Sequence, residues 1–369
     1  MKSKKVYCTL FYHTQGGPVF SRRDFLKTSG LLSLAPLAKV SASVPTPAPR
    51  PLIKPPALKK GDTIGLVTPA SPLFEAHRLL IEVTEKMHNL GFKTKPGKNI
   101  FKRYGYLAGT VQDRIDDLHA MFADPEVKAI IAIRGGYGSA QLLPHLDYEL
   151  IKKNPKILMG YSDITSLLLG IHAQTGLVTF HGPVAESTFT DYTRSNMQHA
   201  LMSTDAPWTV PDAPYEANLQ TSNRIWAYRG GVSTGRLLGG NMTLFTSLLG
   251  TPYEVDTSDA ILFFEEVGEE PYDLDRMLNH MKMAGKFDRC KGVIFDKMPS
   301  VKPADYEPAF YRNLSVEQVI EDVFKDFDFP VCIGFSLGHI KNKPTMPMGI
   351  HVKLDGDKRQ ITFLEAAVR

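Results

Sequence analysis

The sequence predicts an α/β protein with two domains, and three observations lead to this prediction. Apolar runs of strand length alternate with segments of helical spacing, and each run is apolar throughout, which is typical of a parallel sheet covered on both faces. Polar, turn-rich residues interrupt the alternation between 186 and 233. The length of 369 residues suffices for two domains. We expect a flavodoxin-like parallel-sheet domain over 59–190, a crossing segment over 191–234 and a second α/β domain over 235–369.

The first domain is expected to alternate strands and helices in a regular order. A strand near 62–71 precedes a helix with apolar spacing from Leu73 to Leu90, which Gly91 ends. Thr110 to Asp113 resembles a capping box and starts the next helix. Three further strands are expected, ending at RGGYG, GYSD and FHGP, with a helix over DITSLLLGIHAQTG between the last two.

The second domain repeats the alternation with a different ending. GRLLGGNMTLFTSLLG resumes the pattern at Gly235, and Asp259–Gly285 is expected to form a strand, an acidic loop and a helix. KGVIFDK and Phe329–His339 are expected to be further strands. The tail, IHVKLDGDKRQITFLE, alternates in polarity around an Asp-Gly turn, so it predicts a β-hairpin.

The N-terminal residues are typical of an export signal rather than of a folded domain. SRRDFLK contains adjacent arginines, and a short apolar run with the small-residue end Val40–Ala42 follows it. Twin arginines indicate the Tat route, so we predict a signal over 1–42 and export to the periplasm, or a cytoplasmic location if the signal is not used. Residues 43–58 are rich in proline and are interpreted as a linker. No other stretch is long and apolar enough for a transmembrane helix, so we expect no stable membrane insertion after the signal is removed.

Composition excludes several classes of function. The net charge of +4 comes from the predicted signal, because residues 1–42 hold seven of the 43 basic residues and one of the 39 acidic residues. The remaining chain has 36 basic and 38 acidic residues, so its charge gives no reason to expect nucleic-acid binding. The three cysteines form no C-x-x-C pair, and no H-E-x-x-H is present, so we predict no metal. A Cys290–Cys332 disulfide is compatible with the sequence but not indicated by the spacing.

Ser162, in the stretch ILMGYSDIT, is the first candidate catalytic residue. Gly160-Tyr161-Ser162 matches most of the G-x-S-x-G turn that exposes a nucleophilic serine after a strand, although Ile164 replaces the second glycine. The alternative is that Ser162 or Asp163 only caps the helix that follows. The stretch by itself does not decide between the two.

Further polar groups follow other predicted strands, where the reactive groups of parallel sheets lie. Gly135 or Gly136 is expected to offer one backbone N–H to an oxyanion and Asp163 another, although Gly-Gly is also common in plain turns. Glu265 directly follows five apolar residues, so it is expected to be buried and to need a partner such as histidine. His339 ends a later strand, and serine, acid, histidine is an order that a hydrolase triad takes. His181, which also ends a strand, is the rival base.

Taken together, these clusters resemble the LD-carboxypeptidase family, the muramoyltetrapeptide carboxypeptidases of serine peptidase family S66. The resemblance covers nearly all of the chain after the predicted linker. The matching motifs, in order, are DTIGLVTPASP, IRGGYGSAQLLPHLD, ILMGYSDIT, TFHGP, GRLLGGN, LFFEEVGEEPYDLDRML and IGFSLGH.

The resemblance implies a two-domain serine hydrolase with Ser162 as nucleophile, Glu265 as acid and His339 as base. It also implies a homodimer without a cofactor. The implied substrate is a murein tetrapeptide that loses its terminal D-alanine; in one branch of the family it is a peptide-nucleotide antibiotic. A catalytically silent, exported two-lobed binding protein is the alternative from another class. The terminal carboxylate of the substrate needs a cation or a backbone nest, and Arg134 (beside Gly135) and Arg236 are the candidates. Family members are often cytoplasmic, so the predicted export signal is a departure.

Overall fold

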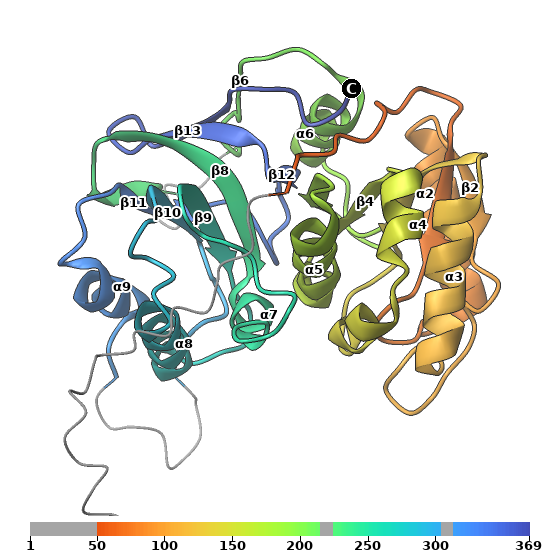
Figure 1. Ribbon diagram of the computed structural model, residues 1–369, viewed down its shortest axis with the longest axis horizontal. Helices are drawn as coiled ribbons and strands as arrows, with labels where there is room; N and C mark the ends of the chain where they lie inside the picture. The colour runs from red at the N-terminus through yellow and green to blue at the C-terminus, as the bar shows by residue number, and fades with distance from the viewer. Residues whose placement is uncertain (1–49, 215–223, 304–312) are drawn as a thin grey trace, which may run out of the picture. The chain divides into compact units, whose positions relative to one another are not determined.

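A computed structural model describes residues 50–214, 224–303 and 313–369. The predicted export signal at 1–42, the first part of the predicted linker and Cys8 lie outside these ranges. All the described residues belong to one compact unit that contains two sheets (Figure 1). Within the described ranges, no helix is long and apolar enough to cross a membrane.

The first sheet has six strands in the order β12-β5-β4-β3-β1-β2. Its strands are β1 Thr63–Val67, β2 Lys93–Pro96, β3 Val127–Ala132, β4 Ile157–Gly160, β5 Thr179–His181 and β12 Met346–Met348. The first five are parallel, and their order 2-1-3-4-5 is that of flavodoxin-like folds, as the sequence predicts. In such sheets ligands bind beyond the carboxyl ends of the strands, so these ends are where the site is sought.

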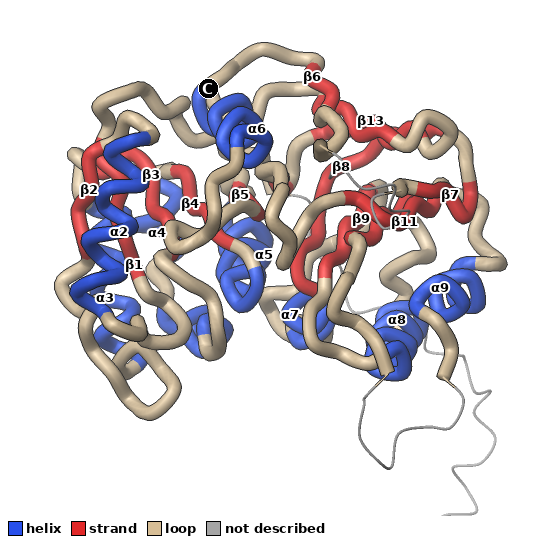
Figure 2. The backbone as a smooth tube through the Cα atoms, turned by 180° about the vertical axis from the view of Figure 1, so that it is seen from behind, coloured by secondary structure: helices blue, strands red, loops and turns tan. Residues whose placement is uncertain are grey.

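The helices of this half begin and end close to where the sequence places them. They are α2 Ala76–Asn89, α3 Val111–Ala123, α4 Tyr148–Lys153, α5 Thr165–Thr175 and α6 Asp191–Met202, with the 3₁₀ segments η1 Ser139–His145 and η2 Ser162–Ile164. Both hydrogen bonds of the Thr110–Asp113 capping box are present at the start of α3. The Thr110 hydroxyl accepts from Asp113 N–H, and the Asp113 carboxylate accepts from Thr110 N–H. Helices α3, α4 and α5 contact one another in succession and cover one face of the sheet (Figure 2).

The second sheet has eight strands in the order β6-β14-β13-β8-β9-β10-β11-β7. The strands are β6 Trp208–Thr209, β7 Trp226–Arg229, β8 Val232–Asn241, β9 Ala260–Glu265, β10 Gly292–Asp296, β11 Val331–Phe335, β13 His351–Asp355 and β14 Gln360–Phe363. Strands β8 to β11 are parallel, and the outer strands are antiparallel. The helices are α7 Met242–Ser247, α8 Pro271–Met283 and α9 Val316–Phe324. Strands β13 and β14 form the predicted tail hairpin.

The path of the chain differs from the simple division into an N-terminal and a C-terminal half. Strand β12 pairs antiparallel with β5, so a segment near the C-terminus completes the first sheet. The predicted crossing segment 191–234 also supplies β6 and β7 to the second sheet. Residues Ile53 to Leu58 of the predicted linker hydrogen-bond to Gly176, Leu201 and Arg369, so they belong to the folded unit. Proline-rich composition predicts their extended conformation but not these long-range partners.

The disulfide that the sequence left open does not form. Cys290 and Cys332 are both free and buried. The Cys290 thiol donates to the carbonyls of Ala260 and Gly292 instead. Burial raises the pKa of Cys290 to about 11 and that of Cys332 to about 12, which keeps both thiols protonated and unreactive.

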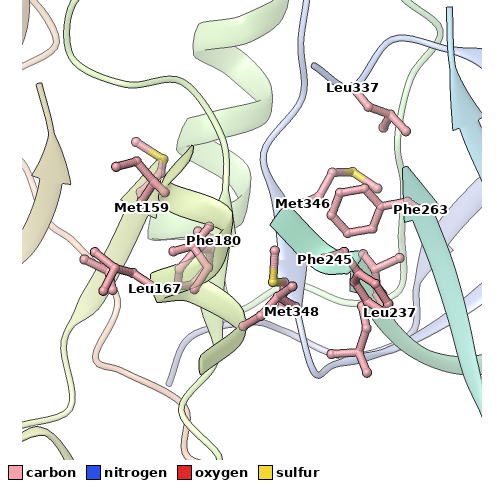
Figure 3. Packing of buried hydrophobic residues seen from close by; sticks show 14 of the residues in the cluster. Met159, Leu167, Phe180, Leu237, Phe245, Phe263, Leu337, Met346 and Met348 are labelled. Carbon is pink, nitrogen blue, oxygen red and sulfur yellow. The ribbon is translucent and has the colours of Figure 1, made fainter. Parts of the chain in front are cut away.

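Apolar side chains fill the space between the two sheets. Strand β12 contacts β5 and α5 on one side and β8 on the other. In Figure 3, Met348 lies between Phe180 on the side of the first sheet and Phe245 on the side of the second. All three side chains are buried, so β12 joins the two halves through the core as well as through strand pairing.

Replacing Met348 with alanine tests this joint. Met348 is fully buried, so Met348→Ala should lower the free energy of unfolding by about 2 to 5 kcal/mol, the usual cost of such a truncation in a core. Met283→Ala is the matched control, because Met283 is 81% exposed, and it should change stability by less than about 0.5 kcal/mol. Urea titrations of the two variants give the comparison, and equal midpoints would contradict the central position of β12.

Candidate active site

Ser162 lies in a strained turn between β4 and the helix that follows. Its φ is 61°, in the left-handed region that serine rarely adopts. Such a conformation costs on the order of 1 to 3 kcal/mol and persists only where the surrounding structure holds it. The turn thus has the character of a nucleophile elbow, although Ile164 is not glycine. Ser162 is therefore not an ordinary helix cap, and no side-chain capping bond is present at the start of η2 or α5.

The loop after β3 packs directly against this turn. A Cβ atom added to Gly135 would lie 3.1 Å from Cβ and 3.3 Å from Oγ of Ser162, so a larger residue would crowd the serine. The Asp163 carboxylate accepts hydrogen bonds from the backbone N–H groups of Gly138 (3.2 Å) and Ser139 (2.8 Å). The Ser139 hydroxyl donates to the Asp163 carbonyl at 2.5 Å. Asp163 thus fastens the glycine loop to the Ser162 turn through its side chain, a role that the sequence did not reveal.

Backbone donors are available beside Ser162. Neither Gly136 N–H nor Asp163 N–H has a hydrogen-bond acceptor within the described ranges. Asp163 lies at the N-terminal end of η2 and α5, where N–H groups have no intrahelical acceptor and the helix dipole favours negative charge. These two groups are therefore available as hydrogen-bond donors beside Ser162, and their role as an oxyanion hole stays a prediction.

Glu265 and His339 form a hydrogen-bonded pair at the carboxyl end of the second sheet. His339 Nδ1 lies 2.7 Å from Glu265 Oε2. The Glu265 side chain has no solvent exposure, whereas that of His339 is 22% exposed. A Cβ atom at position 338 would lie 2.2 Å from Glu265 Oε2, so only glycine lets the backbone pass close enough for His339 to reach the carboxylate. This explains the Gly338-His339 sequence in GFSLGH.

His339 reaches across to the first sheet. Its ring centroid lies 4.9 Å from that of Tyr161, the residue before Ser162. The structure thus brings Ser162, Glu265 and His339 into one region. Glu265 ends β9 and Ser162 comes two residues after β4, but His339 lies in the loop four residues after β11, not at the end of the strand as the sequence predicts. Across the described part of the chain, Ser162 Oγ makes no hydrogen bond to His339, and such bonds are often long in enzymes without substrate.

The rival base, His181, has a different position. It is fully buried, and its Nε2 lies 3.1 Å from the carbonyl of Leu337. Burial lowers the pKa of His181 to about 4, so the ring is neutral at physiological pH. Leu337 N–H in turn donates to Asp296 Oδ1 at 3.0 Å. The backbone of Leu337, two residues before His339, is therefore held from the first sheet by His181 at its carbonyl and from the second by Asp296 at its N–H.

A second hydrogen-bonded link joins the sheets beside the nucleophile. Glu266 is buried and accepts bonds from Asn241 Nδ2 (2.9 Å) and from the backbone N–H of Thr243 (2.8 Å). The Asn241 N–H donates to Thr165 Oγ1, in the first turn of α5, at 3.1 Å. Asn241, the last residue of the GRLLGGN motif, thus links two elements. Its backbone binds the first turn of α5, and its side chain binds Glu266, the residue after Glu265.

Buried charges surround the Glu265–His339 pair. Strand pairing of Phe264 with Phe295 puts the next residues, Glu265 and Asp296, side by side. Burial, and then the charge of Glu265, raise the pKa of Asp296 to about 7. Lys343 is also buried, with its ammonium 4.7 Å from the centroid of the Tyr161 ring, and burial lowers its pKa against the attraction of both carboxylates. Lys343 is therefore a buried cation attracted by two carboxylates that have little access to water.

The structure separates the two arginines that the sequence offers for substrate binding. Arg134 follows β3 and lies at the site, with its guanidinium 4.7 Å from the centroid of the Phe74 ring and Nε 3.8 Å from Glu186. Arg236 pairs with Ala260 at the start of β9, whereas Glu265 is at its end, a separation of roughly 16 Å. Arg236 binds the carbonyl of Ser258 there. The expectation that Arg236 contacts substrate is therefore wrong, because it is at the opposite end of the strand.

Sequence reasoning missed Asp296, Lys343 and Tyr161 as parts of the site. Asp296 ends a strand in KGVIFDK. It is therefore, like Glu265, an acidic residue that directly follows an apolar run. Lys343 lies in a loop that no periodicity describes. Tyr161 was visible only as the variable residue of the Gly160–Ser162 motif.

Asp296 makes a pH-dependent contribution to stability whose sign follows from its pKa. The folded-state pKa of about 7 exceeds the ordinary value of 3.8, so the stability that Asp296 confers is present at low pH and is lost as pH rises through 7. Asp296→Asn removes this loss. Relative to the wild type, the variant should therefore gain on the order of 2 kcal/mol of unfolding free energy between pH 5 and pH 7.5.

Denaturant unfolding at both pH values measures this gain. Asp326→Asn, at a side chain that is 73% exposed, controls for the removal of a surface carboxylate. A difference between Asp296→Asn and the wild type that is the same at both pH values would contradict the shifted pKa.

The chain is similar to known proteins over most of its length. The family models for the LD-carboxypeptidase N-terminal and C-terminal domains match residues 64–182 and 234–354. A probable murein peptide carboxypeptidase of Bacillus subtilis is 38% identical over 320 residues, which are 85% of this chain and 95% of that protein. The microcin C7 self-immunity protein MccF of Escherichia coli is 29% identical over 339 residues, which cover 85% of this chain and 96% of that protein.

Solved structures share the architecture. A structure of MccF in complex with glutamyl sulfamoyl guanosine superposes with a TM-score of 0.77 at 27% identity, over 86% of this chain and all of that one. The muramoyltetrapeptide carboxypeptidase of Oxalobacter formigenes has the same fold, with a TM-score of 0.69 at 24% identity over 81% of this chain and 97% of that one. The two family models together match more than half of the chain. The chain belongs to the LD-carboxypeptidase family.

Proposed function

We propose that the protein is a serine LD-carboxypeptidase that releases the terminal D-alanine of murein tetrapeptides. The observation that supports this most directly is the 2.7 Å hydrogen bond between buried Glu265 and His339, beside the turn that exposes Ser162. A histidine held by a buried carboxylate next to a serine is the arrangement that activates a hydroxyl for attack on an amide. The similarity to a probable murein peptide carboxypeptidase supports the substrate class.

In the proposed mechanism His339 acts first as base and then as acid. The Glu265 bond to Nδ1 keeps the proton on that nitrogen, so Nε2 accepts the Ser162 proton as Oγ attacks the carbonyl carbon. The oxyanion accepts hydrogen bonds from Gly136 N–H and Asp163 N–H, each worth on the order of 3 kcal/mol. The imidazolium then protonates the leaving nitrogen of D-alanine. Water repeats the two proton transfers on the acyl-enzyme and frees Ser162.

The buried surroundings strengthen these steps. Glu265 has no exposed surface, so its charge interacts with the imidazolium through protein rather than through water. Lys343 and the raised pKa of Asp296 limit the negative charge that accumulates beside Glu265. Arg134 remains a candidate to bind a carboxylate in the acyl part of the substrate, because its guanidinium packs on Phe74, after β1, rather than beside His339.

A second candidate function has its own support. MccF is similar over 85% of this chain and is named for self-immunity to microcin C7, so hydrolysis of a peptide-nucleotide antibiotic is the alternative. It would use the same serine, glutamate and histidine. An exported binding protein without catalysis is less well supported, because a buried carboxylate with a histidine partner beside a strained serine is what a serine hydrolase requires and a binding cleft does not.

Substitution of the three residues tests the catalytic assignment. Ser162→Ala, Glu265→Gln and His339→Asn should each lower kcat for D-alanine release by a factor on the order of 10³ or more, because the three act as a unit. Free D-alanine from a synthetic murein tetrapeptide is measured by mass spectrometry. Ser195→Ala, at an exposed serine on α6, should retain wild-type turnover.

Comparing turnover of the tetrapeptide with turnover of a peptidyl nucleotide separates the candidate functions. Turnover of a peptidyl nucleotide but not of the tetrapeptide would favour the immunity-type hydrolase. Normal tetrapeptide turnover by Ser162→Ala would exclude Ser162 as the nucleophile. Binding of either substrate without any product from the wild type would leave the binding protein as the explanation.

We also propose that the enzyme is exported and acts as a homodimer on muropeptides in the periplasm. Export rests on the adjacent arginines of SRRDFLK and the short apolar run after them. Replacing Arg22 and Arg23 with lysine should move the protein from the periplasmic to the cytoplasmic fraction, as immunoblots of fractionated cells would reveal. Equal export of the double variant would refute the twin-arginine route.

A further inference from the structure

Exposed aromatic side chains are concentrated at one edge of the first sheet. Across the described ranges six aromatic side chains are more than a third exposed, and five of them follow β1, β2 or β3. These five, which we call the aromatic patch, are Phe74, Phe101, Tyr104, Tyr106 and Tyr137, and their exposure is between 48% and 67%. Scattered exposed rings need no explanation, but a group of them in loops at the carboxyl edge of a parallel sheet marks a binding surface.

Neighbouring groups restrain three of the five rings of the patch, Phe74, Tyr106 and Tyr137. The rings of Tyr106 and Tyr137 meet edge to face, with centroids 5.5 Å apart. The guanidinium groups of Arg134 and Arg103 lie 4.7 Å and 5.9 Å from the centroid of the Phe74 ring. A surface that is fixed before the ligand arrives loses less conformational entropy on binding.

The patch begins beside the nucleophile. Gly135 lies against Ser162, and Tyr137 is only two residues further along the same loop. Tyr137 N–H donates to Ser71 Oγ at 3.1 Å, and Ser71 N–H donates to the Gly135 carbonyl at 3.3 Å. These bonds tie the loops after β1 and β3 together, so the patch and the Ser162 turn form one continuous surface.

Strand order places Ser162 between the patch and the base. In the order β12-β5-β4-β3-β1-β2, Ser162 follows β4, and the patch follows β3, β1 and β2. On the other side, His181 of β5 binds Leu337, two residues before His339. The base therefore approaches Ser162 from the β5 side and the patch extends from the β3 side.

This order fixes the direction of the substrate. His339 protonates the leaving nitrogen, so the departing D-alanine must lie toward His339. The part of the substrate that forms the acyl-enzyme then extends the other way, over the patch. In a tetrapeptide, three residues precede the scissile bond and span at most roughly 10 Å. Tyr137 is two residues after Gly135, which lies against Ser162, so at most roughly 7 Å of backbone separates the first ring of the patch from the nucleophile. The group beyond those three residues in an intact muropeptide is an amino sugar.

We propose that the aromatic patch is a subsite for the amino-sugar end of the muropeptide. This inference rests on the proposed function and deepens it. The C–H face of a pyranose ring is apolar and packs on exposed rings, while its hydroxyl and acetamido groups suit the hydroxyls of Tyr104, Tyr106 and Tyr137. Arg103, beside Phe74, adds donors for the sugar oxygens. The enzyme therefore prefers sugar-linked tetrapeptide to the free peptide.

Two substrates and single-ring variants test the subsite. The value of kcat/KM is measured for the free tetrapeptide and for the disaccharide-linked tetrapeptide. The wild type should prefer the disaccharide form by at least tenfold. Tyr106→Ala and Tyr137→Ala should each reduce that preference by about five- to tenfold, mainly through KM, and Tyr106→Phe should keep most of it. Tyr272→Ala, at the sixth exposed aromatic, should leave the preference unchanged.

Other results would overturn the proposal. An equal loss for both substrates in the patch variants would exclude a sugar subsite, and a wild type without preference would exclude it as well. If Tyr106→Ala dissociated a dimer in sedimentation experiments, the patch would be a contact surface for a second copy of the chain. If the wild type turned over neither substrate, that result would contradict the proposed function but would not test the sugar subsite. Calorimetric binding of the disaccharide alone, present in the wild type and lost in Tyr106→Ala, would then decide on the subsite separately.

Discussion

The site depends on the burial of one carboxylate. Glu265 ends a strand that is buried along its whole length, and its side chain is not exposed to solvent, so its charge needs a partner. Among the described residues, His339 hydrogen-bonds to it and Lys343 attracts it. Removing such a partner leaves an uncompensated buried charge, which costs several kcal/mol. The glycine at 338, the link from Leu337 to His181 and Asp296, and the raised pKa of Asp296 all serve this pairing. Packing around a buried carboxylate therefore positions the imidazole before any substrate binds.

Parallel strand ends explain how distant residues meet. Each sheet orients its carboxyl edge toward the same region, and β12 and the Thr165–Asn241–Glu266 link hold the two edges together. The apolar contacts around Met348 stabilise the joint, while the hydrogen bonds fix its geometry. Because the serine belongs to one sheet and the histidine to the other, any change that shifts this joint also changes the distance between them.

The sequence predicted those parts of the fold and the site that local patterns determine. The fold class, the α3 capping box and the tail hairpin follow from short-range signals, and the structure confirms them. That Ser162, Glu265 and His339 lie in one region was predictable because each ends or follows an apolar strand, while their catalytic roles stay a prediction. Arg236 was misplaced because a motif does not reveal which end of its strand faces the site. The return of β12 to the first sheet and the His181–Leu337–Asp296 contacts depend on long-range packing, which no local pattern encodes.

The return of β12 has a consequence for how the protein is made. Translation delivers β1 to β5 and Ser162 early, but the edge of their sheet beside β5 stays open until Met348 leaves the ribosome. An open strand edge invites pairing with other chains, so the nascent domain is exposed to aggregation during this interval. His339 is also synthesised late, so a growing or truncated chain has the serine without its base. The last part of the chain to be synthesised therefore has two effects. It closes the first sheet with β12, and it brings His339 to the other proposed catalytic residues.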